Sequence, residues 1–362
     1  MTTESGSPPR TKRAPRDTVS TQTRSTERLA DGVYMIRHED APDSFPQGNT
    51  TLIVGASDVL VIDSCYLPSS AEQDVADIRQ WTTTSVRYLV NTHWHYDHTM
   101  GNGVYRDAFP AIKVLAHVET RRQIAGYNPQ WFENFPKRGD QFREAIDSGK
   151  DANGRTLTAG EVAEYERALA GLDPVGREFQ LLAQRTDLVP DVGFDRQLAI
   201  DLDGREVRLL HLGRGNTAGD VVAYLPAERL VVTGDLLDHP VPYLGGGYPI
   251  EEIETLRAVA RLDAETIVPG HGMVLRGEDG RAYLRQVIDF LEAVVAAVDT
   301  EVHQAGSGPR KLDAVKAGVL ARLPIAEWRQ RFAGDDQEAG DFFESFALDG
   351  AITSTYAALW GR

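Results

Sequence analysis

The chain has 362 residues, a formal net charge of −16, 41% hydrophobic residues and 25% charged residues. This length allows one large domain or two ordinary ones with a full core, and the acidic balance disfavours nucleic acid or an anionic membrane as a partner, because both attract positive surfaces. The single cysteine, Cys65, excludes an intrachain disulfide.

Residues 1–28 are polar, contain prolines and show no hydrophobic periodicity, so we interpret them as a disordered tail. From Gly32 onward, short runs rich in β-branched residues predict strands at GVYMIRH, NTTLIVG and DVLVIDS. The segment SAEQDVADIRQWT then has the spacing of a helix. The run SVRYLVNT returns to a strand, and this strand leads into the histidine-rich stretch NTHWHYDHTMGN at residues 91–102.

The second half of the chain alternates in the same way. The run AIKVLAH predicts a strand, and residues from about 118 to 188 are rich in charge and helix formers, which indicates a helical insertion. Strands resume in the hairpin QLAIDLDGREVRLLHL and continue at DVVAYLP, RLVVTGD and TIVPGHG. We therefore predict an α/β domain over residues 29–275 and a helical C-terminal extension over residues 276–362.

The expected location follows from two features that the sequence does not contain, a membrane-spanning apolar run and a secretory signal. No stretch approaches the roughly 20 apolar residues of a membrane helix, and the N-terminal residues contain no apolar run of the kind that a secretory signal requires. We expect a soluble, cytoplasmic protein that acts on a small molecule, without a nucleic acid or membrane partner. A homodimer remains open, because the apolar faces of the C-terminal helices suit either the domain or a second subunit.

The stretch HWHYDH concentrates residues that bind metals. Neutral imidazole suits zinc and similar ions, and a carboxylate compensates charge. If the segment is extended, His93 and His95 point the same way, whereas Asp97 and His98 cannot share one direction. This arrangement favours two neighbouring ion sites. Three more candidate ligands lie where predicted strands end: Asn216 in GRGNTAGD, Asp235 in VVTGD and His271 in VPGHG.

The order HWHYDH, GNTAGD, TGD and PGHG resembles the metallo-β-lactamase superfamily of metal-dependent hydrolases. The resemblance implies a four-layer αββα sandwich with up to two metal ions in a cleft at the sheet edges. It also implies a role for each matching residue: His93 and His95 as first-site ligands, Asp97, His98 and His271 as second-site ligands, Asp235 as the carboxylate that bridges both ions, and Asp63 as a supporting hydrogen-bonding residue that does not ligate.

The chain departs from the family pattern at Asn216. The family takes its third first-site imidazole from a GHT segment, and this chain reads GNT. An amide oxygen is a neutral and weaker donor, better suited to harder ions, and it can instead orient a water molecule. We expect one or two zinc ions, with a tight second site and a first site that is weak, exchangeable, or filled by iron or manganese.

The resemblance predicts a hydrolase in which metal-activated water attacks a carbonyl substrate: an ester, thioester, lactone or amide, with a β-lactam left open. Asp97 is the predicted catalytic residue, because it can accept a hydrogen bond from the activated water or relay its proton. Two alternatives remain: an iron-dependent redox or oxygen enzyme on the same fold, and a catalytically weak metal-binding sensor.

Three further residues are candidates for contact with the substrate. His239 and Tyr243 belong to the segment LLDHPVPYLGGGYPI, whose glycines suit a mobile wall over a cleft, or equally an ordinary surface turn. Tyr96 lies between two candidate ligands and is suited either to hydrogen bonding with an oxyanion or to packing.

Overall fold

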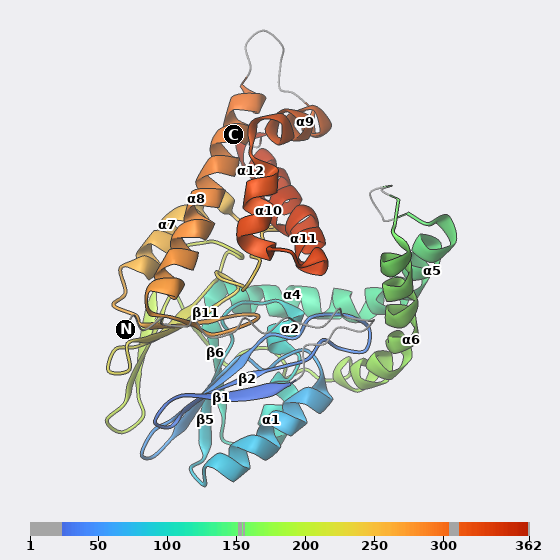
Figure 1. Ribbon diagram of the computed structural model, residues 1–362. Helices are drawn as coiled ribbons and strands as arrows, with labels where there is room; N and C mark the ends of the chain where they lie inside the picture. The colour runs from blue at the N-terminus through green and yellow to red at the C-terminus, as the bar shows by residue number, and fades with distance from the viewer. Residues whose placement is uncertain (1–23, 151–153, 155, 304–310, 361–362) are drawn as a thin grey trace, which may run out of the picture.

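The computed structural model describes residues 24–150, 154, 156–303 and 311–360. In these residues two β-sheets pack face to face and helices cover both outer faces (Figure 1). This arrangement confirms the αββα sandwich predicted from the motifs.

The first sheet follows the order of the chain, and its parallel half places the strand ends where the histidines lie. Its strands are β1 (Ser25–Ala30), β2 (Val33–Arg37), β3 (Thr50–Val54), β4 (Val59–Ile62), β5 (Val86–Val90), β6 (Lys113–His117) and β7 (Val192–Phe194). Neighbours from β1 to β4 are antiparallel and those from β4 to β7 are parallel. Parallel neighbours need crossovers, and helices α1 (Pro68–Trp81), α2 (Tyr96–Thr99) and α3 (Asn102–Ala108) lie in them.

The second sheet has the order β13-β12-β11-β10-β9-β8. Its strands are β8 (Gln197–Asp201), β9 (Glu206–Leu210), β10 (Val222–Leu225), β11 (Leu230–Gly234), β12 (Thr266–Pro269) and β13 (Leu275–Arg276). Strands β11 and β12 are parallel, and helix α7 (Pro249–Ala260) lies in the connection between them. The carboxyl ends of β5, β11 and β12 therefore carry loops to the same edge of the sandwich.

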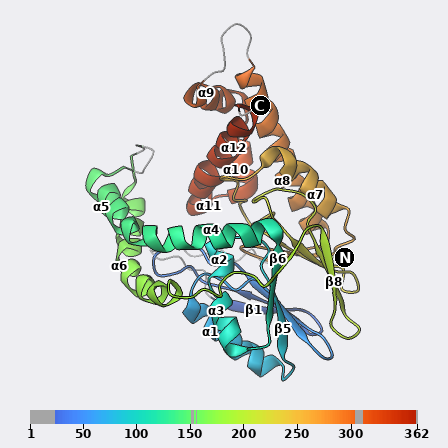
Figure 2. The same ribbon diagram turned by 180° about the vertical axis from the view of Figure 1, so that it is seen from behind.

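Three apolar layers hold the sandwich together. Residues such as Ile62 of β4 and Val232 of β11 fill the space between the sheets. Ile78 of α1 packs on the outer face of the first sheet. On the second sheet lie α7 and the long helix α8 (Gly277–Val302) (Figure 2). These helices bury residues such as Leu256 and Phe290.

The region predicted as a helical insertion is helical. It contains α4 (Val118–Asn134), the short 3₁₀ helix η1 (Phe135–Lys137), α5 (Arg138–Ser148) and α6 (Ala159–Leu182). Phe135 and Phe179 are buried in a core that this region shares with Tyr66 and Met100 of the main domain, and Trp131 packs against the same core. The insertion is thus a packed subdomain beside the sandwich.

The predicted C-terminal extension is also helical and shares its core with the second sheet. It begins with α8 and continues through α9 (Leu312–Arg322), α10 (Ile325–Ala333), α11 (Gln337–Phe342), the π-helix η2 (Phe343–Leu348) and α12 (Asp349–Trp360). Phe343 and Ile352 belong to the same buried cluster as Val231 of β11. Of the helices that the structure describes, none is both long enough and apolar enough to cross a membrane.

Three local predictions differ from the structure. Residues 1–23 of the predicted tail lie outside the described residues, but residues 25–28 belong to β1, so the tail boundary at residue 28 is wrong. This edge strand pairs with β2 through its backbone, and its polar side chains give no apolar signal. The strand β7 was not predicted. The histidine-rich stretch does not stay extended, because Tyr96–Thr99 forms the helical turn α2.

Candidate metal centre

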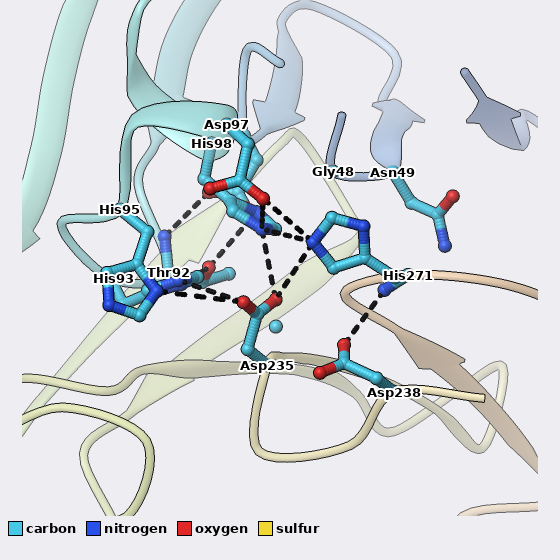
Figure 3. Close-up of polar contacts among 12 residues, drawn as sticks. Gly48, Asn49, Thr92, His93, His95, Asp97, His98, Asp235, Asp238 and His271 are labelled. Atoms are coloured by element: carbon cyan, nitrogen blue, oxygen red, sulfur yellow. Dashed lines mark hydrogen bonds and ion pairs between the residues drawn. The ribbon is translucent and has the colours of Figure 1, made fainter. Parts of the chain in front are cut away.

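The candidate ligands come from separate strand ends and meet at one edge of the sandwich (Figure 3). His93 and His95 follow β5, whereas Asp97 and His98 lie in the turn α2. Asp235 directly follows β11, and His271 follows β12. The helical turn explains how the adjacent residues Asp97 and His98 both face the centre, which an extended segment does not allow.

Asp235 divides these residues into two groups that can each hold an ion. The groups are His93, His95 and Asp235, and Asp97, His98, Asp235 and His271. Oδ2 of Asp235 lies 3.2 Å from Nε2 of His93 and 3.8 Å from Nδ1 of His95. Oδ1 of Asp235 lies 3.0 Å from Nε2 of His98 and 3.8 Å from Nε2 of His271. Each carboxylate oxygen therefore faces a different group.

The second group brings four candidate ligands into close contact. Nε2 of His271 lies 2.9 Å from Oδ2 of Asp97 and 3.2 Å from Nε2 of His98. Asp97 and His98 are buried and His271 is half-buried. Two carboxylates and two imidazoles in this space form a ligand set that suits zinc.

Asp63 sets the orientation of one imidazole in each group. Nδ1 of His98 donates to Oδ2 of Asp63 at 2.9 Å, which turns Nε2 of His98 toward Asp235. Thr92 donates to Asp63 through its backbone N–H at 2.8 Å and its hydroxyl at 2.7 Å. Since that hydroxyl proton is used, Nδ1 of His93 donates to Oγ1 of Thr92 at 3.0 Å and leaves its Nε2 free to ligate.

Asn216 lies beside the first group. Its Nδ2 is 3.4 Å from Nδ1 of His95, and its Oδ1 is buried without a hydrogen-bond partner among the described residues. The loop that carries it is held by the buried Asp220, which accepts from the backbone N–H and the hydroxyl of Thr217. Asn216 therefore borders the first group, and its assignment to the place of the third imidazole stays a prediction from the motif.

Charges in the second group are mutually dependent. Burial alone would raise the pKa of Asp97, but His98 and His271 lower it. Burial alone would lower the pKa of His271, but Asp235 and Asp97 raise it to about 9. The buried carboxylates thus need positive charge beside them, which either imidazolium protons or a metal cation supplies.

Two features of the structure show that the candidate ligands suit a metal centre. Oδ1 of Asn216 is buried without a hydrogen-bond partner among the described residues, and such an atom is costly unless something binds it. The two groups also combine imidazole and carboxylate in the way that zinc and similar ions require.

The three residues predicted to contact substrate occupy different surroundings. The ring of Tyr243 lies perpendicular to that of His95 with centroids 6.3 Å apart. The ring of Tyr96 stacks on Trp131 of α4 at 4.2 Å, and burial raises its pKa to about 12. The ring of His239 packs against Tyr283 of α8 at 5.1 Å. Of the three, Tyr243 is thus the residue whose ring borders a candidate ligand.

The loop that carries Tyr243 is fixed by its neighbours. The backbone N–H of Leu244 donates to the carbonyl of Phe346 in η2, and that of Gly246 donates to Oγ of Ser354 in α12. The ring of Phe346 lies 5.9 Å from that of Tyr243. The C-terminal extension therefore anchors residues 236–250, and the interpretation of this segment as a mobile wall does not match these contacts.

Sequence reasoning missed several residues that hold the ligands. Asp238 accepts from the backbone N–H of His271 at 3.1 Å, and burial together with Asp235 raises its pKa to about 8. Gly48 and Asn49 contact the segments that carry Asp97 and His271 (Figure 3). Asp238 lies three residues after a candidate ligand, which is a usable signal, whereas Gly48 and Asn49 only precede a strand.

Comparison with known proteins agrees with this geometry. The sequence profile described as the metallo-beta-lactamase superfamily matches residues 43–271. The chain belongs to the metallo-β-lactamase superfamily, which confirms the resemblance seen in its motifs. It is 30% identical to metallo-beta-lactamase type 2 of Bacteroides fragilis over 93 aligned residues, a match that covers 23% of this chain and 36% of that protein.

Solved structures share the fold at low sequence identity. The stereoselective inverting sec-alkylsulfatase Pisa1 from Pseudomonas sp. matches 93% of this chain and 50% of its own, with a TM-score of 0.63 and 15% identity. A metallo-beta-lactamase from Pontibacter korlensis matches 75% of this chain and 99% of its own, with a TM-score of 0.50 and 16% identity. This chain therefore spans half the length of the sulfatase and 36% of the curated relative.

Proposed function

We propose that this protein is a metal-dependent hydrolase that cleaves a small ester-type substrate with metal-activated water. The observation that carries the proposal is the division of Asp235 between two groups, with Oδ2 toward His93 and His95 and Oδ1 toward His98 and His271. A carboxylate with one oxygen toward each ligand group would suit a site that holds two metal ions.

The ions would be held by the predicted residues. His93, His95 and Asp235 would hold the first ion, with the amide oxygen of Asn216 as a further donor. Asp97, His98, Asp235 and His271 would hold the second. We propose zinc for the second site, which has four charged or imidazole donors, and weaker binding of zinc, iron or manganese at the first site, where an amide replaces an imidazole.

When bound, such ions supply Lewis acidity to a carbonyl oxygen and make a water molecule more acidic. Asp97 is buried and lies 2.9 Å from His271, so its carboxylate is held at the centre, where it is proposed to accept the proton of the attacking water. Asp63 and Thr92 keep the imidazoles of His98 and His93 in ligating orientation throughout.

The substrate would lie against Tyr243. The ring of Tyr243 borders both His95 and Phe346 of the C-terminal extension. The side chain of Phe346 is 45% exposed. This aromatic wall suits an apolar part of the substrate. Tyr96 and His239 remain proposed substrate contacts, although their rings pack on Trp131 and Tyr283.

A substrate panel tests the reaction class. We would assay chromogenic esters, thioesters, lactones, amides and β-lactams with and without chelator, and add secondary alkyl sulfates because the fold likeness to the sulfatase extends over 93% of the chain. Chelator-sensitive hydrolysis in any class supports the proposal. Bound metal without turnover in any class would favour the sensor alternative.

Metal analysis of protein purified without added metal tests the ion. One to two zinc ions per chain, as the two ligand groups allow, support the hydrolase. Stoichiometric iron with visible absorbance would favour the redox alternative, which the oxygen donor of Asn216 would suit.

Partners and location stay proposals. We propose a small-molecule substrate, no nucleic acid or membrane partner, a cytoplasmic location, and a homodimer as the assembly to test by light scattering. The net charge of −16 supports the proposed lack of a nucleic acid or anionic membrane partner, because it opposes binding to polyanions.

A further inference from the structure

Two residues directly before β3 contact both segments that carry the second ligand group. The backbone N–H of Gly48 donates to the carbonyl of Asp97 at 3.0 Å, and that of Asn49 donates to the carbonyl of Gly270 at 2.7 Å. Nδ2 of Asn49 donates to the carbonyls of Pro269 and Gly272 at 3.0 and 3.2 Å. One short segment is thus hydrogen-bonded both to the turn that carries Asp97 and His98 and to the loop that carries His271 (Figure 3).

Gly48 also forms a wall against the imidazole of His98. A Cβ atom at this position would lie 2.3 Å from Cε1 and 2.6 Å from Nδ1 of His98. Any side chain would therefore displace the ring. Together with Asp63, which fixes Nδ1 from the edge of the ring at 2.9 Å, the Gly48 backbone fixes its plane.

Gly48 is itself held by the buried residues His38 and Asp74 on the side away from the ligands. The carbonyl of Gly48 accepts from Nδ1 of His38 at 2.7 Å, and Nε2 of His38 lies 2.9 Å from Oδ2 of Asp74. His38 and Asp74 are almost fully buried, and Arg24 pairs with Asp74. The segment is therefore fixed on both sides, by α1 through His38 and by the ligand loops in front.

We propose that Gly48 and Asn49 form a positioning bracket for the second metal site. The bracket sets the distance between the helical turn α2, which follows β5 of the first sheet, and the loop after β12 of the second sheet, so that Asp97, His98 and His271 would meet around one ion. The inference rests on the proposed function, since it assigns these residues to an ion that the ligand groups imply.

The bracket acts on one site only. Of the candidate ligands among the described residues, Gly48 and Asn49 contact Asp97, His98 and the loop around His271, whereas His93 is oriented by Thr92. Loss of the bracket should therefore weaken the second ion and spare the first. A general loss of stability would weaken both.

The test compares matched variants by stepwise zinc titration against a chromogenic chelator. Asn49→Ala removes two hydrogen bonds to the His271 loop, and its control is Asn134→Ala at the end of α4. Gly48→Ala places a methyl group on His98, and its control is Gly126→Ala in α4, where a Cβ meets nothing within 4 Å. His271→Ala marks the loss of the second site.

We expect Asn49→Ala and Gly48→Ala to lower the affinity for one zinc ion about 10- to 100-fold. The affinity for the other ion should change by less than about threefold. The weakened ion should be the one that His271→Ala also affects. Both controls should titrate like the wild type. Circular dichroism and the Tm in chelator establish folding, and if Gly48→Ala does not fold, Asn49→Ala alone decides.

The outcomes separate the two proposals. A wild-type chain that binds two zinc ions, together with an Asn49→Ala variant that binds both with unchanged affinity, overturns the bracket and leaves the proposed function standing. Equal loss of affinity for both ions also overturns the bracket, because the bracket is proposed to act on the second site alone. A folded wild-type chain that binds no metal overturns the proposed function itself.

Discussion

Asp63 and His98 are joined by a hydrogen bond of 2.9 Å between the carboxylate Oδ2 and the imidazole Nδ1. The same carboxylate accepts the hydroxyl of Thr92, which in turn accepts from His93. One residue that binds no metal in our assignment therefore orients an imidazole in each ligand group. Asp63 has a φ of 60°, a conformation that asparagine also tolerates, so a conservative replacement is available.

Asp63→Asn should weaken zinc binding at both sites, about 10- to 100-fold. The amide keeps an acceptor for Thr92 but loses the negative charge that makes the imidazole of His98 a stronger donor. Zinc titration in competition with a chelator measures this. Asp58→Asn, which alters a partly exposed pair with Arg87, is the control, and selective loss of only one ion would contradict the shared role.

Asn216→His should strengthen the first site. The side chain of Asn216 already lies 3.4 Å from His95, so an imidazole there adds the donor that the family pattern contains. We expect the zinc content after dialysis to rise toward two ions per chain and the weaker dissociation constant to fall about tenfold or more. Asn134→His on α4 controls for an added surface imidazole. Unchanged zinc content would show that Asn216 does not border an ion site.

Asp97→Ala should reduce turnover by about 10²- to 10⁴-fold on whichever substrate the panel identifies. The carboxylate is both a proposed ligand and the proposed proton acceptor, and its backbone also contacts Gly48. Steady-state kinetics at saturating zinc measure the effect, with Asp140→Ala on the exposed face of α5 as the control. Near wild-type turnover at saturating zinc would be incompatible with the role assigned to Asp97.

The candidate ligand residues can be predicted from the sequence because each belongs to a short motif that follows a strand. Strand periodicity alone places His93, Asp235 and His271 where strands end, and these ends meet at one edge of the sandwich. The error concerned local geometry, since Tyr96–Thr99 turns into a helix and brings Asp97 and His98 to one side. A single helical turn among polar residues has no periodicity that a sequence can display.

Gly48, Asn49 and Phe346 could not be predicted, because their contacts join segments that lie far apart in the chain. Gly48 contributes an amide and the absence of a side chain, and Asn49 donates to carbonyls that are 220 or more positions away in the chain. Phe346, which contacts Tyr243, lies in a π-helix near the C-terminal end of the chain. Such contacts depend on how the sheets and helices pack, which local patterns do not encode.

Phe346→Ala should raise KM for substrates with a bulky apolar group and leave kcat nearly unchanged. The ring lies 5.9 Å from that of Tyr243 and is 45% exposed, so its removal takes away wall surface and no reacting group. We expect about a fivefold loss in kcat/KM, equivalent to about 1 kcal/mol. Leu320→Ala, an exposed apolar residue of α9, is the control. An equal effect on small and bulky substrates would argue against a wall.

Glu252→Gln should stabilise the protein at neutral and alkaline pH. Glu252 lies in the first turn of α7, is 1% exposed, and its Oε1 has no hydrogen-bond partner among the described residues. Burial raises the pKa of this carboxyl well above its usual value of 4.5, and the nearby Asp220 and Asp238 raise it further. The folded protein therefore keeps a proton that the unfolded chain releases.

The sign of the pH dependence follows from that difference. Below pH 4.5 both states are protonated and Glu252 contributes no slope; above it the wild type loses stability until the pH passes the raised pKa. One proton corresponds to at most about 1.4 kcal/mol per pH unit, and glutamine removes this slope. Urea unfolding in chelator at pH 5 and pH 8 measures it, with the exposed Glu133→Gln of α4 as the control. If the variant and the wild type lose stability in parallel between these pH values, Glu252 is ionised in the folded protein and a cation or water outside the described contacts must compensate it.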